Sequence, residues 1–338
     1  MHGNPAPEPA IMVRDLRKSY GKVTALDGLS LAVAPGSITG LLGPNGSGKT
    51  TTVGILSTAL RPDSGQALVR GLDVTARPAE VRGLIGFAGQ FAAVDPNLTG
   101  RENLRLIGRL SRLPRPLARQ RADEALDRFG LSDAAGRLVR GYSGGMRRRL
   151  DVAAALLHRP PVLFLDEPTT GLDPDSRAQL WRMVAGLAAD GTTVLLTTQY
   201  LEEADALADH VVIIDHGRIA GEGTPAELRR QVGAAVVRLE FADEQAAARA
   251  ARQLGARGYG FSQDGTALAQ ASADGAAAVI AAVRALDGAD DPVGVQVREP
   301  SLDEVFLALT GGQAGRPDPR DGHPQDAGLT GAGIGGAA

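Results

Sequence analysis

Short, almost entirely apolar runs alternate along the chain with stretches whose apolar residues repeat at helical spacing. Runs of this kind are typical of strands that are buried on both faces of a largely parallel sheet. Their alternation with helical stretches over residues 11–230 predicts an α/β domain with a mostly parallel sheet. The predicted strands span residues 37–43, 84–90, 161–167, 192–198 and 210–219.

The pattern becomes helical from about residue 97 to residue 157, which predicts a helical subdomain within the α/β domain. Further along, Thr224 and Glu227 have the spacing of a capping box, and Pro225 stands at the first helical position. These residues predict a short helix that closes the domain near residue 230.

A different pattern follows over residues 231–311, where strand-like and Ala-rich helical stretches have the order β-α-β-β-α-β. This order predicts a small α+β domain of the ferredoxin-like kind. Ser301 and Glu304 form another capping box, which predicts a final helix. Residues 1–10 and 312–338 are rich in Gly and Pro and offer little that could build a core, so we expect both segments to be disordered.

The composition narrows the classes of function. The 338 residues include 36 basic and 39 acidic side chains, and this balance argues against a protein that binds nucleic acid through its phosphates. The absence of cysteine excludes disulfides, thiolate metal sites and cysteine nucleophiles. No apolar run is long enough to span a membrane, and the N-terminus holds no apolar signal segment. We therefore expect a cytoplasmic protein, with any membrane partner supplied by another polypeptide.

The sequence GPNGSGKT, residues 43–50, matches the pattern G-x-x-x-x-G-K-[ST] of a phosphate-binding P-loop. It follows a predicted strand and precedes a helical stretch, a context in which backbone N–H groups and a helix N-terminus converge on phosphate. Lys49 is expected to reach the β- and γ-phosphates of a nucleotide, and Thr50 to coordinate Mg²⁺. The residues expected to bind the nucleotide are Gly43, Pro44, Asn45, Gly46, Ser47, Gly48, Lys49, Thr50 and Thr51.

The predicted strand 161–167 ends in two acids, Asp166 and Glu167. Asp166 is placed to hold Mg²⁺, directly or through water, and Glu167 to orient and polarise a water that attacks the γ-phosphate. A strand that merely ends in solvated acids is the alternative, and the P-loop upstream disfavours it. The two acids therefore favour a hydrolase over a nucleotide-binding scaffold.

The stretch YSGGMRRRLDVAAAL, residues 142–156, begins with a helix N-terminus that can bind an anion. Ser143 is a natural N-cap, and Gly144 and Gly145 leave the first N–H groups of the helix uncovered. The sequence thus predicts a second phosphate-binding element, separate from the P-loop.

Three consecutive arginines, Arg147, Arg148 and Arg149, follow in the same helix. They span nearly a full turn and cannot share one face. The predicted buried stripe of this helix consists of Met146, Leu150, Ala153, Ala154 and Leu157. We expect the arginines to be mostly solvated, with one or two of them contributing to a phosphate-rich interface, since a nucleic-acid patch would need more basic surface.

Taken in order, these motifs resemble those of the ATP-binding cassette (ABC) ATPases. The P-loop, YSGGM at a helix start, LFLDEPTTGLDP and a strand ending in TTQ follow one another as in that family, from residue 20 to about residue 221. The resemblance implies a P-loop NTPase fold that uses ATP and Mg²⁺. It also implies a homodimer or a paired cassette, in which Ser143, Gly144 and Gly145 contact the γ-phosphate of an ATP on the opposite P-loop.

The resemblance assigns roles to residues outside these motifs as well. Tyr20 lies where the family stacks an aromatic ring on adenine, with a half-buried strand tyrosine as the alternative. Gln90 matches the Q-loop, which contacts Mg²⁺ and moves with the membrane partner. The segment after Gln90 is expected to form the groove that receives a coupling helix of that partner, with a plain surface loop as the alternative.

Two more positions align with motifs of the family, but only one of them has the residue type that is usual there. Asp173 matches the D-loop at the dimer interface, and it is also placed to cap the next helix, with Pro174 at the first helical position. Gln199 stands where most members have a histidine that contacts the γ-phosphate. Its amide can donate a hydrogen bond but cannot carry a proton, which leaves Glu167 as the leading catalytic candidate.

The stretches YSGGMRRRLD, TTQYLEEAD and EPSLDEVFLALTG resemble the daunorubicin/doxorubicin-resistance group of export ATPases. We therefore expect the ATPase subunit of a drug or antibiotic exporter, peripheral on the inner face of the cell membrane and paired with an integral-membrane permease of the ABC-2 type. One alternative is the ATPase of a transporter for a lipid, a polysaccharide, a peptide or an imported substrate. A soluble cassette acting on nucleic acid or ribosomes is another. The small C-terminal domain is open to a ligand-sensing or a packing role.

Overall fold

The structure is a computed structural model that describes residues 8–90, 93–233, 235–272, 292–298 and 300–310, with three single residues between 281 and 286. The predicted disordered tail 312–338 and residues 1–7 lie outside the described residues. Ala10 lies within them and is buried, and its backbone pairs with that of Val33 and Arg70. Regular backbone pairing therefore begins slightly before the predicted boundary at residue 11.

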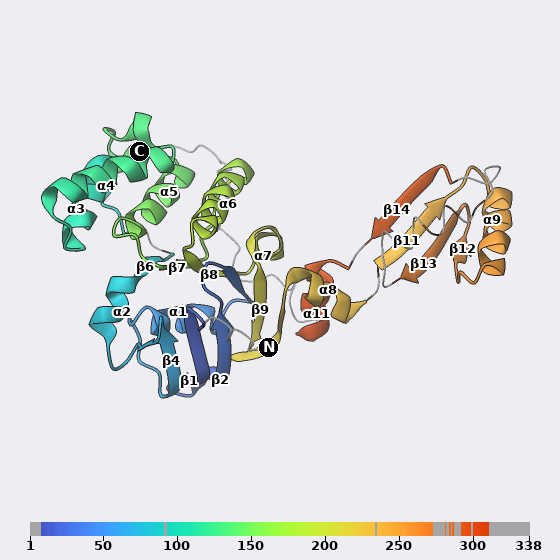
Figure 1. Ribbon diagram of the computed structural model, residues 1–338, viewed down its shortest axis with the longest axis horizontal. Coiled ribbons are helices and arrows are strands. Elements are labelled where there is room, and N and C mark those ends of the chain that lie inside the picture. The colour runs from blue at the N-terminus through green and yellow to red at the C-terminus, as the bar shows by residue number, and fades with distance from the viewer. Residues whose placement is uncertain are drawn as a thin grey trace, which may run out of the picture.

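A six-stranded sheet forms the centre of the larger part of the molecule, with the strand order β10-β9-β3-β8-β7-β6 (Figure 1). Its strands are β3 (Ile38–Leu42), β6 (Ile85–Ala88), β7 (Val162–Asp166), β8 (Thr193–Thr198), β9 (His210–Asp215) and β10 (Arg218–Gly223). All neighbouring pairs are parallel except β9 with β10, which confirms the predicted mostly parallel sheet. Leu42 pairs with Thr198 and Asp166 with Thr197, so the carboxyl ends of three inner strands meet at one edge.

The prediction of a single strand over residues 210–219 is wrong. The chain reverses at His216 and Gly217, whose φ angles of 46° and 75° are both left-handed. Two such residues in succession form the tight turn of a two-residue hairpin, so Arg218 pairs with Asp215. As a result β9 stays in the parallel sheet, and β10 becomes its antiparallel edge.

A second sheet is antiparallel, with the strand order β2-β1-β4-β5, and its strands were not among the clear predictions. It consists of β1 (Ile11–Tyr20), β2 (Val23–Val33), β4 (Ser64–Val69) and β5 (Leu72–Asp73), and it shares a core with α1 (Lys49–Leu56). Leu26 of β2, Val53 of α1 and Phe164 of the central sheet are fully buried in this core. Helix α1 is therefore held between the two sheets, which fixes its N-terminus beside the P-loop. Helix α2 (Pro78–Leu84) follows this sheet and leads into β6.

The predicted helical stretch forms α3 (Gly100–Leu110), α4 (Arg115–Arg128) and α5 (Gly144–Ala155), which gather with α6 (Pro174–Ala189) in Figure 1. Leu104, Leu126 and Leu150 from the first three helices are buried in one core with Leu163 and Leu165 of β7. Side chains alternate along a strand, so this core covers the face of the sheet opposite to α1.

The C-terminal part holds a four-stranded antiparallel sheet with the order β12-β13-β11-β14. Its elements are β11 (Ala235–Glu240), α9 (Glu244–Ala256), β12 (Ser262–Asp264), β13 (Ala267–Ser272) and β14 (Gly294–Arg298). The first and the last strand of this part, β11 and β14, pair with each other, as the predicted ferredoxin-like order requires. The second predicted helix, residues 275–286, falls almost wholly outside the described residues, so the complete ferredoxin-like fold stays a prediction.

The final helix, α11 (Leu302–Leu309), does not pack on the small sheet with which the sequence analysis grouped it. Leu302, Val305 and Phe306 are buried against α7 (Leu201–Leu207) and α8 (Pro225–Val232). The predicted capping boxes of α8 and α11 are both present. The chain thus leaves the larger part, forms the small sheet and returns to the larger part with its last described helix.

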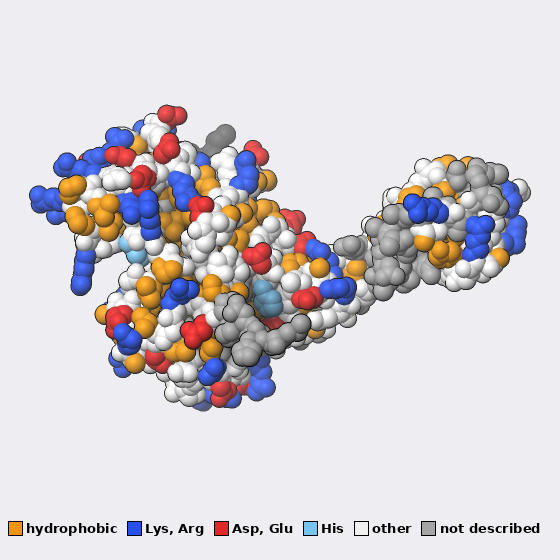
Figure 2. Space-filling model, viewed as in Figure 1, with side chains coloured by type: hydrophobic (Ala, Val, Ile, Leu, Met, Phe, Trp, Pro, Cys, Tyr) orange, Lys and Arg blue, Asp and Glu red, His pale blue; other side chains and the backbone are white. Residues whose placement is uncertain are grey.

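The surface carries both signs of charge. Figure 2 shows acidic and basic side chains interspersed over most of this face, with basic ones prominent on the lobe that α3 and α4 form. Among the described residues, no helix combines the length and the apolar character that a membrane crossing requires.

Candidate active site

The P-loop lies between β3 and α1, and the sheet register brings the ends of β7 and β8 beside it. Its backbone requires glycine, because Gly46 and Gly48 have φ angles of 82° and 111°. A Cβ atom at Gly48 would lie 2.6 Å from the carbonyl oxygen of Ala25, and one at Gly43 would lie 2.3 Å from that of Ile214. The loop is therefore a tight turn that leads into a helix N-terminus, as a phosphate-binding loop must be.

Lys49 is the charged group of this loop. Its side chain is 4% exposed, and its Nζ donates to the carbonyl oxygens of Gly43 at 2.7 Å and Pro44 at 3.0 Å. The carboxylate of Glu167 lies 3.8 Å from Nζ. Burial lowers the pKa of Lys49, and the charges of Glu167 and Asp166 offset part of this effect. A buried ammonium held this way is suited to an anionic ligand such as the phosphates of a nucleotide.

Ser47 gives independent support for a ligand at the loop. Its hydroxyl is buried and lacks a hydrogen-bond partner among the described residues. A buried polar atom without a partner costs free energy. A phosphate oxygen or an ordered water is therefore expected to complete the hydrogen bonds of Ser47.

Asp166 ends β7 beside the P-loop. Thr197 Oγ1 donates to Asp166 Oδ1 at 2.5 Å, and Thr50 Oγ1 donates to the same oxygen at 3.4 Å. Neighbouring oxygen ligands on an octahedral Mg²⁺ ion stand about 3 Å apart, so Thr50 and Asp166 fit a shared ion with little adjustment. Thr197, which the sequence analysis did not single out, fixes the orientation of the carboxylate.

Glu167 occupies a strained position directly after Asp166. Its φ angle of 46° is left-handed, a conformation that costs free energy for a residue with a side chain. Its backbone N–H donates to the carbonyl oxygen of Thr197 at 3.2 Å and to Thr197 Oγ1 at 3.0 Å, and Thr170 Oγ1 donates to its Oε2 at 3.4 Å. This conformation turns the carboxylate out of the strand direction and toward Lys49.

Several predicted site residues meet in one cavity of about 500 Å³. Gln90, Gly144 and Glu167 line it together with Arg147, Arg148, Thr170, Gly171 and Leu172. The end of β6, the start of α5 and the end of β7 therefore converge at this cavity. The structure thus brings the predicted Q-loop residue and the first residue of α5 beside the predicted catalytic acid.

The start of α5 has the predicted geometry. Ser143 is the N-cap, and its Oγ accepts a hydrogen bond from the N–H of Met146 at 3.2 Å. Ser143 and Gly144 are exposed, whereas Gly145 is buried against α6. The exposed end of the helix is open to an anion from outside the chain, because the first N–H groups of a helix lack intrahelical partners.

Gly145→Ala is expected to lower the free energy of unfolding by about 1–3 kcal/mol, the range that an extra group in a well-packed protein interior usually costs. A Cβ atom at Gly145 would lie 2.3 Å from Ser176 Oγ and 2.7 Å from Ser176 Cβ, so α5 and α6 would have to separate. Gly144→Ala is the matched control, because its Cβ atom would meet its nearest neighbour only at 4.0 Å. Thermal unfolding of both variants measures the difference, and equal melting temperatures would contradict the close helix contact.

The expectation of mostly solvated arginines is wrong for Arg148. Arg147 is exposed and Arg149 is half-buried, but the Arg148 side chain is only 11% exposed. Burial lowers its pKa, and the nearby Asp151 carboxylate offsets part of this effect. Helical spacing identified a stripe of apolar residues but could not reveal that backbone carbonyl groups at the carboxyl ends of β6 and β7 surround Arg148.

Three further predicted residues are not among those that line this cavity. Tyr20 is 48% exposed, and the ammonium of Lys18 lies 5.6 Å from the centre of its ring. Asp173 caps α6 by accepting from the N–H of Ser176 at 2.9 Å, a bond that lowers the pKa of Asp173. Gln199 follows β8 and is partly exposed. The structure confirms the capping role of Asp173, and the nucleotide contacts of the three residues stay predictions.

Glu203 is a buried acid that the sequence analysis did not single out. It lies in α7, shortly after Gln199, and is fully buried. Trp181 Nε1 donates to its Oε1 at 3.2 Å, and its Oε2 lacks a partner among the described residues. Burial raises the pKa of Glu203. Glu202, the preceding residue in the same helix, is exposed. Only the packing of α6 on α7 makes Glu203 the buried one of these two adjacent acids.

The free energy of unfolding of Glu203→Gln, relative to that of wild type, is expected to increase as the pH rises. The folded protein holds the Glu203 proton at pH values where the unfolded chain, with a pKa near 4.5, has released it. The contribution of Glu203 to the free energy of unfolding therefore falls as the pH rises from 4.5 through the raised pKa. Urea unfolding of both proteins at about pH 5 and about pH 8 measures this. An equal difference between the proteins at both pH values would refute the expectation.

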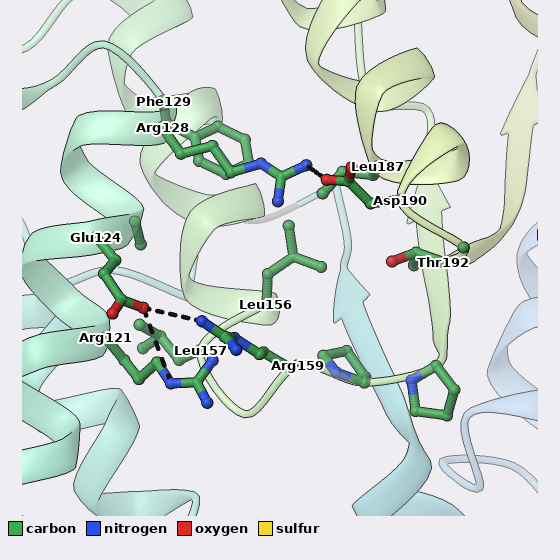
Figure 3. Close-up of a pocket in the computed structure, with 14 residues that line it drawn as sticks. Arg121, Glu124, Arg128, Phe129, Leu156, Leu157, Arg159, Leu187, Asp190 and Thr192 are labelled. Carbon is green, nitrogen blue, oxygen red and sulfur yellow. Dashed lines mark hydrogen bonds and ion pairs between the residues drawn. The ribbon is translucent and has the colours of Figure 1, made fainter.

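A separate cavity of about 620 Å³ lies away from the P-loop, between α4 and the ends of α5 and α6 (Figure 3). Its arginines are already paired: Arg128 with Asp190 at 2.5 Å, and Arg159 with Glu124 at 3.2 Å. Arg121 also lies 3.9 Å from Glu124. These pairs neutralise much of the charge of the cavity, which contains none of the predicted site residues.

Comparisons with known proteins agree with this geometry. Residues 26–170 match the family model described as ABC transporter. The chain is 50% identical over 311 residues to the daunorubicin/doxorubicin resistance ATP-binding protein DrrA of Streptomyces peucetius, covering 91% of this chain and 94% of that protein. It is 47% identical over 309 residues to the doxorubicin resistance ATP-binding protein DrrA of Mycobacterium tuberculosis, covering 89% and 93%.

A solved structure shares the fold of the larger part. It is an ATP-binding cassette in a dimeric post-hydrolysis state bound to ADP and phosphate, 26% identical with a TM-score of 0.58, and the match covers 63% of this chain and 98% of that one. The P-loop geometry, the family model and the two close relatives agree. The chain therefore belongs to the ABC transporter family, as an ATP-binding subunit similar to the daunorubicin- and doxorubicin-resistance proteins.

Proposed function

We propose that this chain is the ATP-hydrolysing subunit of an exporter that moves a drug or antibiotic through a separate membrane permease. The observation that carries the proposal is the convergence of Lys49, Asp166 and Glu167 at the P-loop. Such a constellation binds and cleaves a nucleoside triphosphate. The cargo class is supported by the likeness to the two drug-resistance proteins.

In this proposal, each residue of the site has a task in hydrolysis. Lys49 and the N–H groups of the P-loop bind the phosphates. Thr50, Asp166 and Gln90 would hold Mg²⁺, which would supply positive charge to the phosphates. Glu167 orients the attacking water and accepts its proton.

Three further residues complete nucleotide binding in this proposal. Tyr20 presents an exposed ring to adenine, and Gln199 donates an amide hydrogen bond to the γ-phosphate. Asp173 caps α6, and its exposed carboxylate can contact a second cassette across the dimer interface.

The active form in this proposal is a dimer of cassettes. The exposed start of α5, with Ser143 and Gly144, is open to the γ-phosphate of an ATP on the P-loop of a partner. The dimeric state of the solved cassette supports this arrangement. A homodimer or a paired cassette would supply the second P-loop.

We infer that the permease, of the ABC-2 type, docks beside Gln90. Leu106 and Leu110 on α3 are 43% and 73% exposed, and Phe87 on β6 is 46% exposed. Exposed large apolar side chains favour contact with a partner protein. Exposed basic residues of the same lobe, such as Arg109 and Arg112, favour a place on the inner face of an anionic membrane (Figure 2).

A pull-down tests the proposed function. Tagged Glu167→Gln protein, incubated with ATP and Mg²⁺, is recovered from native membranes, and the proteins that accompany it are identified. Recovery of a polytopic permease would support export and name the protein whose cargo should be assayed. Recovery of ribosomes or DNA-bound proteins without a membrane protein would overturn the transport function while leaving the ATPase intact.

A further inference from the structure

The Arg148 guanidinium donates to three backbone carbonyl groups in two segments of the chain. Its Nη1 donates to the carbonyl oxygen of Gly89 at 2.5 Å, and its Nη2 donates to that of Asp166 at 3.1 Å. Its Nε donates to the carbonyl oxygen of Pro168 at 2.8 Å. The guanidinium plane is rigid, so these bonds fix the separation of the end of β6 from the end of β7.

The three carbonyl groups belong to the neighbours of two functional residues. Gly89 directly precedes Gln90, and Asp166 and Pro168 flank Glu167 on both sides. Arg148 therefore holds the backbone next to the proposed Mg²⁺ ligand and on either side of the proposed catalytic acid. All of these residues lie in the part of the chain that the structure describes.

Asp151 completes the unit from the next turn of α5. Its Oδ2 accepts from Arg148 Nη1 at 3.2 Å, and its Oδ1 accepts from the backbone N–H of Ala93 at 2.8 Å. Asp151 is 2% exposed. The ion pair thus ties α5 to the chain on the far side of Gln90 as well as to the chain before it.

Stability alone does not account for this arrangement. Burying an ion pair costs desolvation energy that its attraction often fails to recover, and an apolar pair of similar volume is often as stable. The bonds of Arg148 instead hold the backbone conformation around Glu167. The left-handed φ of Glu167 is strained, and it persists only where surrounding residues hold it in place. Thr197 constrains the N–H of Glu167, and Arg148 constrains the carbonyls before and after it.

We propose that Arg148 and Asp151 form a positioning unit for ATP hydrolysis that sets Glu167 and Gln90 in register with each other. The unit rests on the ATPase function proposed above. It acts through the backbone, so its loss should slow the chemical step while leaving nucleotide binding to the P-loop.

Arg148→Lys is the sharpest single test. Lysine keeps the positive charge, but its three donors share one nitrogen and cannot reproduce the planar fork that spans the three carbonyl groups. A misplacement of about 1 Å at an active site can cost about 100-fold in rate, so we expect kcat to fall by about 100-fold with KM for ATP changed less than about threefold. Arg149→Lys is the matched control, since Arg149 also donates to one backbone carbonyl, that of Phe129, on the same helix. Its kcat should stay within about twofold of wild type.

The double variant Arg148→Met with Asp151→Leu separates positioning from folding. Removal of both charges should leave a melting temperature close to that of wild type, whereas kcat should remain about 100-fold lower. A double variant with the melting temperature and the kcat of wild type would overturn the positioning role. If instead the single and double variants both fail to fold, the pair is structural and the proposal is also overturned. Absence of ATPase activity in the wild-type protein would refute the proposed function. That outcome is distinct from the two that would overturn the positioning role.

Discussion

Glu167→Gln is expected to lower the kcat of ATP hydrolysis by at least about 100-fold, the range that a lost general base commonly costs. The carboxylate lies 3.8 Å from Lys49 Nζ and follows the Asp166 side chain that would hold Mg²⁺. Glutamine keeps the size of the side chain but cannot accept the proton of the attacking water. Binding of ATP should persist, because the P-loop and Lys49 are untouched. The variant should therefore accumulate as an ATP-bound dimer.

Phosphate release from purified protein measures kcat, and size-exclusion chromatography with ATP and Mg²⁺ detects the trapped dimer. Glu222→Gln is the control, because Glu222 is exposed on β10 at the edge of the central sheet. Its kcat should match that of wild type. Unchanged hydrolysis by Glu167→Gln would remove Glu167 from the catalytic role and leave Gln199 as the candidate to test next.

Lys49→Met is expected to weaken ATP binding by about 100-fold. A charge-assisted hydrogen bond contributes about 1.5–3 kcal/mol, and Lys49 is the charged donor of the P-loop. Methionine preserves much of the volume of a side chain that is 4% exposed, so the loop need not collapse. Because the substitution acts on binding, the dissociation constant should rise for both ATP and ADP.

Titration calorimetry with ATP in the presence of Mg²⁺ measures the effect. Lys22→Met is the control, since Lys22 is exposed in the turn between β1 and β2. Its dissociation constant should agree with that of wild type. Equal ATP affinity for Lys49→Met and wild type would contradict phosphate binding by the P-loop lysine.

Local signals in the sequence were sufficient for much of the site. The P-loop follows from glycines whose φ angles only glycine adopts readily, and from the strand and helix on either side. The caps at Ser143, Asp173 and Thr224 follow from side chains that bond to N–H groups a few residues away. Such features depend on neighbours within one turn, so a pattern of residues contains them completely.

The errors arose where a residue depends on distant parts of the chain. The strand predicted over 210–219 hid a turn at His216 and Gly217, because apolar residues on both sides made the run look continuous. The final helix was grouped with the preceding domain, although its apolar face is buried on α7 and α8. Sequence order does not indicate which surface a helix covers when two surfaces are within reach.

By itself the sequence indicated the P-loop, the α/β class and the strands of the central sheet except for the turn between β9 and β10, because each depends on spacing and side-chain chemistry. Only the tertiary structure decided that Arg148 and Glu203 are buried. Both residues stand in helices whose local pattern permits a solvated side chain. The environment of Arg148 is made by backbone carbonyl groups just after β6 and β7, and that of Glu203 by the packing of α6 on α7. The burial of a charge depends on which segments meet around it, and that is a property of the folded chain rather than of its periodicity.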